Sequence, residues 1–255
     1  MKEGGDFYVL YSAVVQIKNS NVAKSTAQNG LFIYSNDLLN STLGLEGVRV
    51  SDITSTVEDA VLIHSSKGSL QAVNSTIEDV NIPLFKFKEM LVTFDGLLIR
   101  QIHCKASVPC LIEGTSVDLD IMNTRVSDII ANNPVIAITQ SNKLRMFDAQ
   151  FLKMELFSKT SPSYAIQVWG IKNVTIEESL FQSINSSFLF FRQSDLLISY
   201  TLFMNKDQIS SRPMNFITLE DTNTVIIGST FSGAKSSAEL SRGVMSFQAQ
   251  LFLFL

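Results

Sequence analysis

One eight-residue pattern recurs nine times along the chain, and it constrains the fold more than any other feature. An apolar residue, any residue and a second apolar residue precede two positions that usually hold Asn, Asp or Gly; a small residue, any residue and a third apolar residue follow. The final apolar positions are Val22, Val50, Ile77, Ile99, Val126, Phe151, Phe181, Phe203 and Phe231. They lie 28, 27, 22, 27, 25, 30, 22 and 28 residues apart. A period between about 20 and 50 residues is typical of stacked repeats, so the pattern predicts a solenoid.

Within each repeat the apolar residues follow a period of two rather than 3.6. Residues 119–121 and 124–126 show two short alternating stretches separated by turn residues, which predict a strand, a turn and a second strand. A further apolar stretch lies upstream of each pair, for example at 135–138 and 188–191. Three short strands per repeat predict an all-β parallel β-helix with nine to ten coils of roughly 26 residues, where a coil is one full turn of the β-helix.

The bend between the second and third predicted strands has a consistent residue type. Seven of its nine positions are Asn, Asp or Gly, namely Asn19, Gly47, Asn74, Gly96, Asn123, Asp148 and Gly228. These residues tolerate a left-handed backbone at a tight corner. We therefore expect them to form a structural corner ladder, in which the amide of one Asn bonds to the Asn of a neighbouring coil.

With this corner and this period, the chain resembles the right-handed parallel β-helix, or pectin-lyase-like, superfamily. The resemblance spans residues 7–255 and is strongest to the non-enzymatic repeats found in large surface proteins of microbes and single-celled eukaryotes. It implies the right-handed coil. The leucine-rich repeat is the main alternative, but it places Asn three residues after the second apolar position, whereas Asn123 follows Ile121 by two. Another β-rich fold is a further alternative.

The repeat runs almost from end to end, without a Pro- or Gly-rich break, which predicts a single domain over residues 1–255. Apolar residues make up 45% of the chain and charged residues 17%, enough for a continuous core. Residues 243–247 start a further coil, and the chain then finishes in an apolar run. These features predict a fragment of a longer repeat protein with an unfinished last coil; the alternative is that the apolar run folds back as a cap.

Two kinds of residue bear on the cellular compartment. Cys104 and Cys110 bracket a short loop and are either a disulfide or a pair of free thiols. Asn-x-Ser/Thr sequons begin at Asn40, Asn173 and Asn185 as candidate glycosylation sites, and a fourth begins at the corner residue Asn74, where a glycan would fit poorly. The expectation is an extracellular or cell-surface glycoprotein, tethered to a membrane by sequence outside this chain, although sequons also arise by chance in a chain rich in Asn, Ser and Thr.

Residue types argue against catalysis. Hydrolases of this fold use clustered carboxylates, but the predicted first strands offer only Lys86, Lys88, Glu113, Arg192 and Glu220. Elsewhere, Asp118 and Asp120 align with Lys143 and Arg145 one coil later, which predicts cross-coil ion pairs rather than a calcium site, while Glu177 and Glu178 form a second acidic pair. No catalytic residue, metal or cofactor is predicted. A carbohydrate-active lyase or hydrolase, or a degenerate relative, is the alternative.

The predicted partner surface is the first-strand flank. Residues 188–191 and 135–138 are apolar at odd and even positions alike, as in strands covered on both faces, so another domain of the same longer chain or a protein partner is expected there. Carbohydrate is a further candidate, because Tyr164 and Trp169 flank a strand. His64 and His103 are expected to be surface or packing residues. Nucleic acid is excluded because no basic stripe exists. Together these features predict a structural or interaction module of the adhesin or stalk type.

Overall fold

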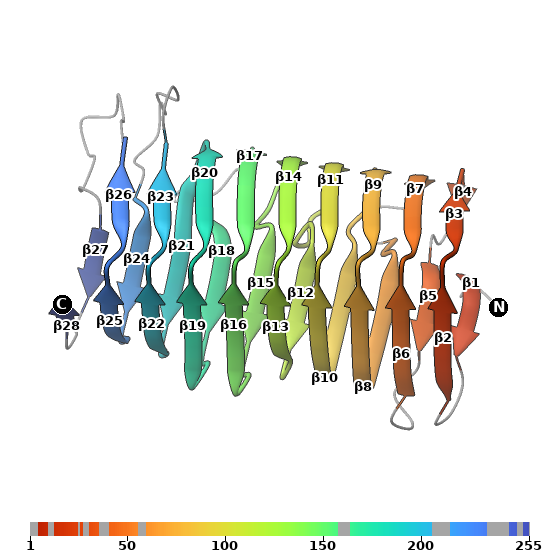
Figure 1. Cartoon of the computed structure of the whole chain (residues 1–255), viewed down its shortest axis with the longest axis horizontal. Coiled ribbons are helices and arrows are strands. Elements are labelled where there is room, and N and C mark those ends of the chain that lie inside the picture. Colours follow the sequence, from red (N-terminus) through yellow and green to blue (C-terminus); the bar gives the residue numbers. More distant parts are fainter. Residues whose placement is uncertain are drawn as a thin grey trace.

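The protein is described from a computed structural model, which describes residues 5–9, 13–24, 26–27, 31–35, 41–55, 60–157, 164–205, 215–233, 245–248 and 252–254. Within these ranges the secondary structure is entirely β, and every strand pairing is parallel. Figure 1 shows the strands side by side along the long axis of the molecule, with the N- and C-termini at opposite ends. The all-β parallel solenoid predicted from the sequence is confirmed.

Each coil passes through three stacked layers of strands. The first-strand layer holds β1 (Gly5–Val9), β5 (Leu31–Ser35), β12 (Ile112–Thr115), β15 (Ile136–Thr139), β18 (Tyr164–Trp169), β21 (Ser187–Arg192), β24 (Ile217–Glu220) and β27 (Met245–Gln248). The second-strand layer holds β2 (Val14–Lys18), β6 (Ser41–Glu46), β13 (Asp118–Met122), β16 (Lys143–Phe147), β19 (Asn173–Glu177), β22 (Asp195–Ser199), β25 (Asn223–Ile227) and β28 (Phe252–Phe254). The third-strand layer holds β3 (Asn21–Ala23), β7 (Arg49–Ser55), β9 (Thr76–Val80), β11 (Leu98–Cys104), β14 (Arg125–Ala131), β17 (Gln150–Leu156), β20 (Leu180–Ile184), β23 (Leu202–Met204) and β26 (Thr230–Ser232), with the short β4 (Thr26–Ala27) beside β7.

Two coils depart from three separate strands. β8 (Ile63–Val73) and β10 (Phe85–Asp95) each run through the first- and second-strand layers without a break, and they join those layers into one sheet. Among the described residues the third-strand layer holds nine strands in register, from β3 to β26, and β27 and β28 add the first two strands of a further coil. The outermost coils fall partly on residues outside the described ranges.

The coil is right-handed, as the resemblance implied. In Figure 1 the second and third strands rise at the front, the first strands descend behind them, and each turn is displaced toward the C-terminus.

The interior of the tube is a stack of aligned apolar side chains. Ile121 pairs with Met146, which pairs with Ile176, and all three are buried at 2% exposure or less. The row continues through Ile198 to Ile226. Since each coil contributes only a few inward side chains, its core is completed by its neighbours, and the coils stabilise one another.

In the third-strand layer, the C-terminal half of the interior is built from stacked phenylalanines. The rings of Phe151, Phe181, Phe203 and Phe231 lie 5.1, 5.0 and 4.8 Å apart between successive centroids, with interplanar angles of 4°, 6° and 4°. The spacing follows from the register, which places each ring directly over the preceding one. These are four of the nine apolar positions by which the repeat was defined.

The seven corner residues named from the sequence all have positive φ, as do the two exceptions, Glu178 (50°) and Tyr200 (49°). Asn and Gly alternate here for a steric reason: a Cβ on Gly47 would come within 2.7 Å of the Asn19 Oδ1, and one on Gly96 within 2.5 Å of the Asn74 Oδ1. The expected Asn-to-Asn bond is therefore wrong at these steps, because the Asn side chain covers a glycine.

Hydroxyl groups link the coils at the next position of the corner. The backbone N–H of Val48 donates to the Ser75 Oγ (3.1 Å), and that of Ala149 donates to the Ser179 Oγ (3.2 Å). Each hydroxyl in turn donates to the carbonyl oxygen two residues before it. The small residues of the repeat thus satisfy backbone donors that the tight turn leaves without a strand partner.

Candidate functional site

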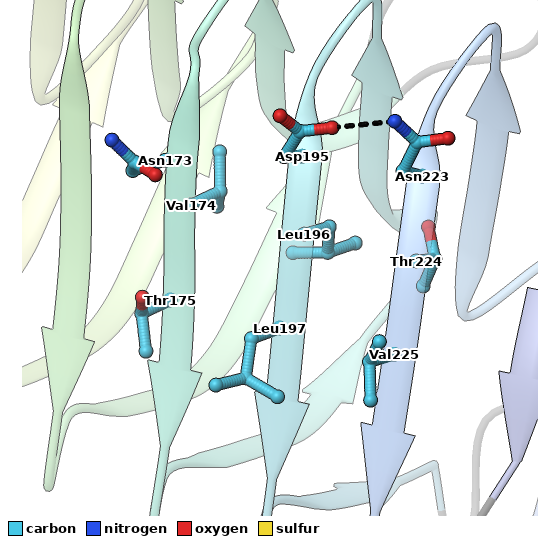
Figure 2. A pocket seen from close by; sticks show the side chains of 9 residues that line it. All are labelled: Asn173, Val174, Thr175, Asp195, Leu196, Leu197, Asn223, Thr224 and Val225. Atoms are coloured by element: carbon cyan, nitrogen blue, oxygen red, sulfur yellow. Dashed lines mark hydrogen bonds between the residues drawn. The ribbon is translucent and has the colours of Figure 1, made fainter.

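A pocket of about 450 Å³ opens on the outer face of the second-strand layer, across β19, β22 and β25. Figure 2 shows its nine lining residues: Asn173, Val174, Thr175, Asp195, Leu196, Leu197, Asn223, Thr224 and Val225. Each of the three strands contributes three consecutive residues. Because side chains alternate along a strand, the middle residue of each three points into the core and the other two lie outside. The register then sets Asp195 opposite Asn223, and Leu197 between Thr175 and Val225.

The pocket has a polar rim and an apolar floor. At the rim, the Asn223 Nδ2 donates to the Asp195 Oδ1 at 2.7 Å. On the floor, Leu197 and Val225 are half-buried. Such a surface suits a ligand with both polar edges and an apolar face.

The acidic pair Asp118 and Asp120 lies further along the same face, and the two carboxylates have different partners. Asp120 makes the predicted cross-coil ion pair, with its Oδ1 2.7 Å from the Lys143 Nζ. Asp118 instead accepts hydrogen bonds from the backbone N–H groups of Asn142 (2.9 Å) and Lys143 (3.1 Å). Arg145 lies 3.9 Å from Glu177, one coil further on.

The first-strand face carries two cross-coil ion pairs. Lys86 lies 3.0 Å from Glu113, and the Arg192 Nε lies 3.6 Å from Glu220. Lys88 is exposed and lies 3.8 Å from Glu89. The charged residues expected near a catalytic face are therefore mostly paired with one another.

Tyr164 and Trp169 differ in their environments: Tyr164 is buried, whereas Trp169 is exposed. Tyr164 is buried against Phe190, with ring centroids 5.0 Å apart, and burial raises the pKa of its phenol, although a hydrogen bond with Thr218 lowers it in part. Trp169 is 48% exposed, donates from its Nε1 to Gln193 (2.9 Å), and has the guanidinium of Arg192 4.8 Å from its ring centroid. The two rings do not form a joint stacking platform.

The two histidines lie apart. His64 is half-buried on β8. His103 is exposed at a second hollow of about 360 Å³ on the third-strand face. That hollow is lined by Gln101, His103, Asp128, Ile129, Ile130, Lys153 and Glu155.

A buried carboxylate on the third-strand layer was missed by the sequence analysis. Glu78 is 2% exposed and forms ion pairs with Arg100 on the following coil and Arg49 on the preceding coil. The hydrogen bond from Arg100 is the main reason that the pKa of Glu78 lies below its ordinary value, since it outweighs the opposing effect of burial, and Arg49 adds to it. The period-two alternation of the sequence could have placed the Glu78 side chain on the outer face of its strand. That Arg49 and Arg100 both reach it follows only from the register of three successive coils.

The structure joins Cys104 and Cys110 in a disulfide, with 5.6 Å between their Cα atoms. The bond closes the connection between β11 and β12.

The sequons differ in their surroundings. Asn40 lies outside the described residues. Asn74 leans over Gly96 at the corner, and the Asn185 Oδ1 accepts a hydrogen bond from the backbone of Leu156 at 2.7 Å. Asn173 is exposed at the rim of the second-strand pocket (Figure 2).

Within the described ranges, no three His, Cys, Asp or Glu side chains gather closely enough to hold a metal ion. The described residues form no helix with the length and apolar character needed to cross a membrane.

A solved structure with the same architecture is the full-length tailspike protein 2 of an Escherichia coli bacteriophage, with 11% identity and a TM-score of 0.51 over 97% of this chain. This chain is a parallel β-helix. It spans 38% of the tailspike's length. The catalytic domain of a GH87 α-1,3-glucanase with nigerose matches over 94% of this chain and 58% of its own, at 11% identity and a TM-score of 0.36.

The A-module of the Azotobacter vinelandii mannuronan C-5 epimerase AlgE4 matches over 96% of this chain and 91% of its own, at 9% identity and a TM-score of 0.32. No protein-family model and no curated protein sequence matches the chain. At 11% identity the likeness to the tailspike shows the fold alone.

Proposed function

We propose that the chain is a rigid structural or interaction module of a larger extracellular or surface protein, with no catalysis of its own. The observation that carries this proposal is the engagement of eight carboxylates in cross-coil ion pairs. The pairs are Lys18–Glu46, Arg49–Glu78, Arg100–Glu78, Lys67–Glu89, Lys86–Glu113, Lys143–Asp120, Arg145–Glu177, Lys153–Asp128 and Arg192–Glu220. Each joins residues on adjacent coils.

Acid–base catalysis needs carboxyl groups whose protonation is tuned for proton transfer near neutral pH. Glu78, the most buried carboxylate among these pairs, has the opposite property, because its arginine partners hold it ionised. Charges arranged in this way stabilise the stacking of coils, and a long rod held at many points is suited to spacing or presenting other domains.

The partner surface in this proposal is the first-strand flank, covered by a further domain of the same longer chain or by a protein partner. Outward positions there include the half-buried Phe190, with Trp169 nearby on the preceding coil. Hydrogen exchange on the longer protein is expected to protect the backbone of β18 and β21 beyond its level in this chain alone. Equal exchange rates in the two would contradict this placement.

Catalysis is tested directly on the purified chain. Polygalacturonate and alginate are incubated with it, with calcium or with a chelator, and both reducing ends and unsaturated uronates are measured. We expect no turnover above buffer, while an active polysaccharide lyase in the same assay shows that the substrates are competent. Reproducible turnover would overturn the non-catalytic proposal.

The alternative function, a carbohydrate-active lyase or hydrolase, is favoured by one observation: the third-strand hollow brings together His103, Asp128, Lys153 and Glu155. If turnover were found, its loss in Asp128→Asn and Glu155→Gln would locate the activity there. Trp169→Ala, on the first-strand face, is the matched control and is expected to leave such turnover unchanged.

A further inference from the structure

The second-strand pocket and the sequon at its rim belong together. Asn173 and Thr175 are two residues apart on β19, so strand geometry sets both on the outer face. Neither side chain has a hydrogen-bond partner among the described residues, and Asn173 is exposed. The acceptor amide and the hydroxyl that a glycosylating enzyme recognises are therefore both accessible.

The other described sequons have different surroundings. At Asn185, the side-chain oxygen accepts the backbone N–H of Leu156, and the sequon hydroxyl of Ser187 is buried and accepts the backbone N–H of Asn215 (3.1 Å). At Asn74, the side chain covers Gly96 as part of the coil-to-coil packing. A glycan attached at the Nδ2 of Asn185 would have to fit beside this hydrogen bond, and a glycan at Asn74 would crowd the packing over Gly96.

The disulfide supplies an independent observation about the compartment. The structure closes Cys104 and Cys110 into a bond, and such bonds form and persist in oxidising compartments such as the secretory pathway. Chains that pass through that pathway in eukaryotic cells meet the machinery for N-glycosylation.

The geometry points to Asn173 as an N-glycosylation site whose first sugar packs in the second-strand pocket. In the transfer, the Nδ2 of Asn173 bonds to C1 of the sugar of a lipid-linked oligosaccharide, the C1–O bond to the lipid diphosphate breaks, the diphosphate leaves with the electron pair, and Nδ2 loses one proton. Oxidation states do not change.

The pocket fits the first sugar in size and chemistry. Its volume of about 450 Å³ lies within the ~300–1,000 Å³ typical of small-molecule sites. Leu197 and Val225 offer an apolar floor to the sugar's ring face, and the polar side chains of Asp195 and Asn223 lie at the rim, where its hydroxyls would come (Figure 2). A sugar attached at Asn173 starts at the rim of this pocket.

Glycan mapping tests the site. The full chain, with a cleavable secretion leader, is expressed in a eukaryotic host, and occupancy at each sequon is read by mass spectrometry after glycosidase digestion in ¹⁸O water. We expect Asn173 to be occupied and Asn185 unmodified in the folded secreted protein, and Thr175→Val to abolish the modification of Asn173 alone. If secretion fails, translation into microsomes gives the same readout. An unmodified Asn173 in either system, or an occupied Asn185 in folded protein, would overturn the assignment.

A second measurement tests the packing. Trimming the glycan to its first sugar is expected to leave the melting temperature unchanged, while the unglycosylated Thr175→Val variant is expected to melt about 2–4 °C lower. In a Leu197→Ser background this difference is expected to vanish, although Asn173 stays occupied. An undiminished difference in that background would show that the sugar does not rest on the pocket floor.

Discussion

The two halves of the third-strand layer stack their coils by different means. In the N-terminal half, aliphatic residues such as Ile77 and Ile99 fill the interior, and a buried outer carboxylate, Glu78, bridges Arg49 and Arg100. In the C-terminal half, aromatic rings fill the interior, and the outer positions aligned between β17, β20 and β23 are Leu152, Gln182 and Met204. The same backbone geometry thus allows two kinds of contact between coils: ion pairs on the outer face and stacked aromatic rings in the interior.

The largest expected effect lies in the aromatic half. Phe181→Ala removes a ring that stacks on Phe151 and on Phe203, and it leaves a cavity between coils, so we expect a loss of about 3–5 kcal/mol in the free energy of unfolding. Urea denaturation measures it. Phe181→Leu, which keeps most of the volume, should cost clearly less, and an equal cost for both would show that ring stacking and cavity size are not the source.

The charged half is expected to depend on Glu78. Glu78→Gln removes the charge shared by two arginines, but both arginines are partly exposed and can be hydrated, so the expected loss is about 1–2 kcal/mol. Glu46→Gln is the matched control, because the Lys18–Glu46 pair is 57% exposed on both sides and should contribute about 0–1 kcal/mol. Equal effects of the two substitutions would mean that burial adds nothing.

The contributions of the two halves to stability are expected to differ in their dependence on pH. The folded pKa of Glu78 lies below its ordinary value of 4.5, so its contribution to stability is present above that value and is lost as the pH falls through the folded pKa. The stability difference between the parent and Glu78→Gln should therefore shrink in acid, whereas that between the parent and Phe181→Ala should stay constant. Denaturation curves from neutral pH down to strongly acidic pH check both; a Glu78 difference that grows in acid would contradict the sign.

The smallest difference in stability between the halves is expected for a contact that both contain, the serine hydroxyl that accepts a backbone N–H of the preceding coil. Ser75→Ala and Ser179→Ala each leave one buried backbone N–H without its acceptor, at a cost of about 1–3 kcal/mol. Because the geometry is the same, the two costs should agree within a few tenths of a kcal/mol. A large disparity between them would show that the hydroxyl ladder depends on the core beneath it.

Sequence reasoning reached the coil and its interior because both are periodic. The corner was predictable where Asn or Gly occupies it, but Glu178 and Tyr200 adopt the same left-handed conformation only because the coils above and below impose it. Further left-handed positions, which the repeat pattern did not predict, recur elsewhere in the coil: Lys67, Glu89, Ser116, Gln140 and Gln193 follow the first strands, and Asp52, Asp79, Gln101, Asp128, Lys153 and Ser183 lie within the third strands.

The functional surfaces were less accessible from the sequence. The pocket at Asn173 is shaped by residues on three strands whose alignment depends on the number of residues in each turn, and that number varies between coils. The same is true of Glu78, whose partners lie on the coils before and after it. Cys104 and Cys110 are only six residues apart, and even there the sequence left two outcomes open.

The alternation of Asn and Gly at the corner restricts how such a rod can change length. Deleting the single coil that carries Gly96 would bring Asn123 directly over Asn74, where the Asn74 Oδ1 leaves no room for a Cβ atom. Removing the coils of Gly47 and Asn74 together instead places Gly96 next to Asn19, which keeps a glycine beside the Asn side chain. In this stretch, gene duplications and deletions that preserve packing should therefore add or remove coils in pairs.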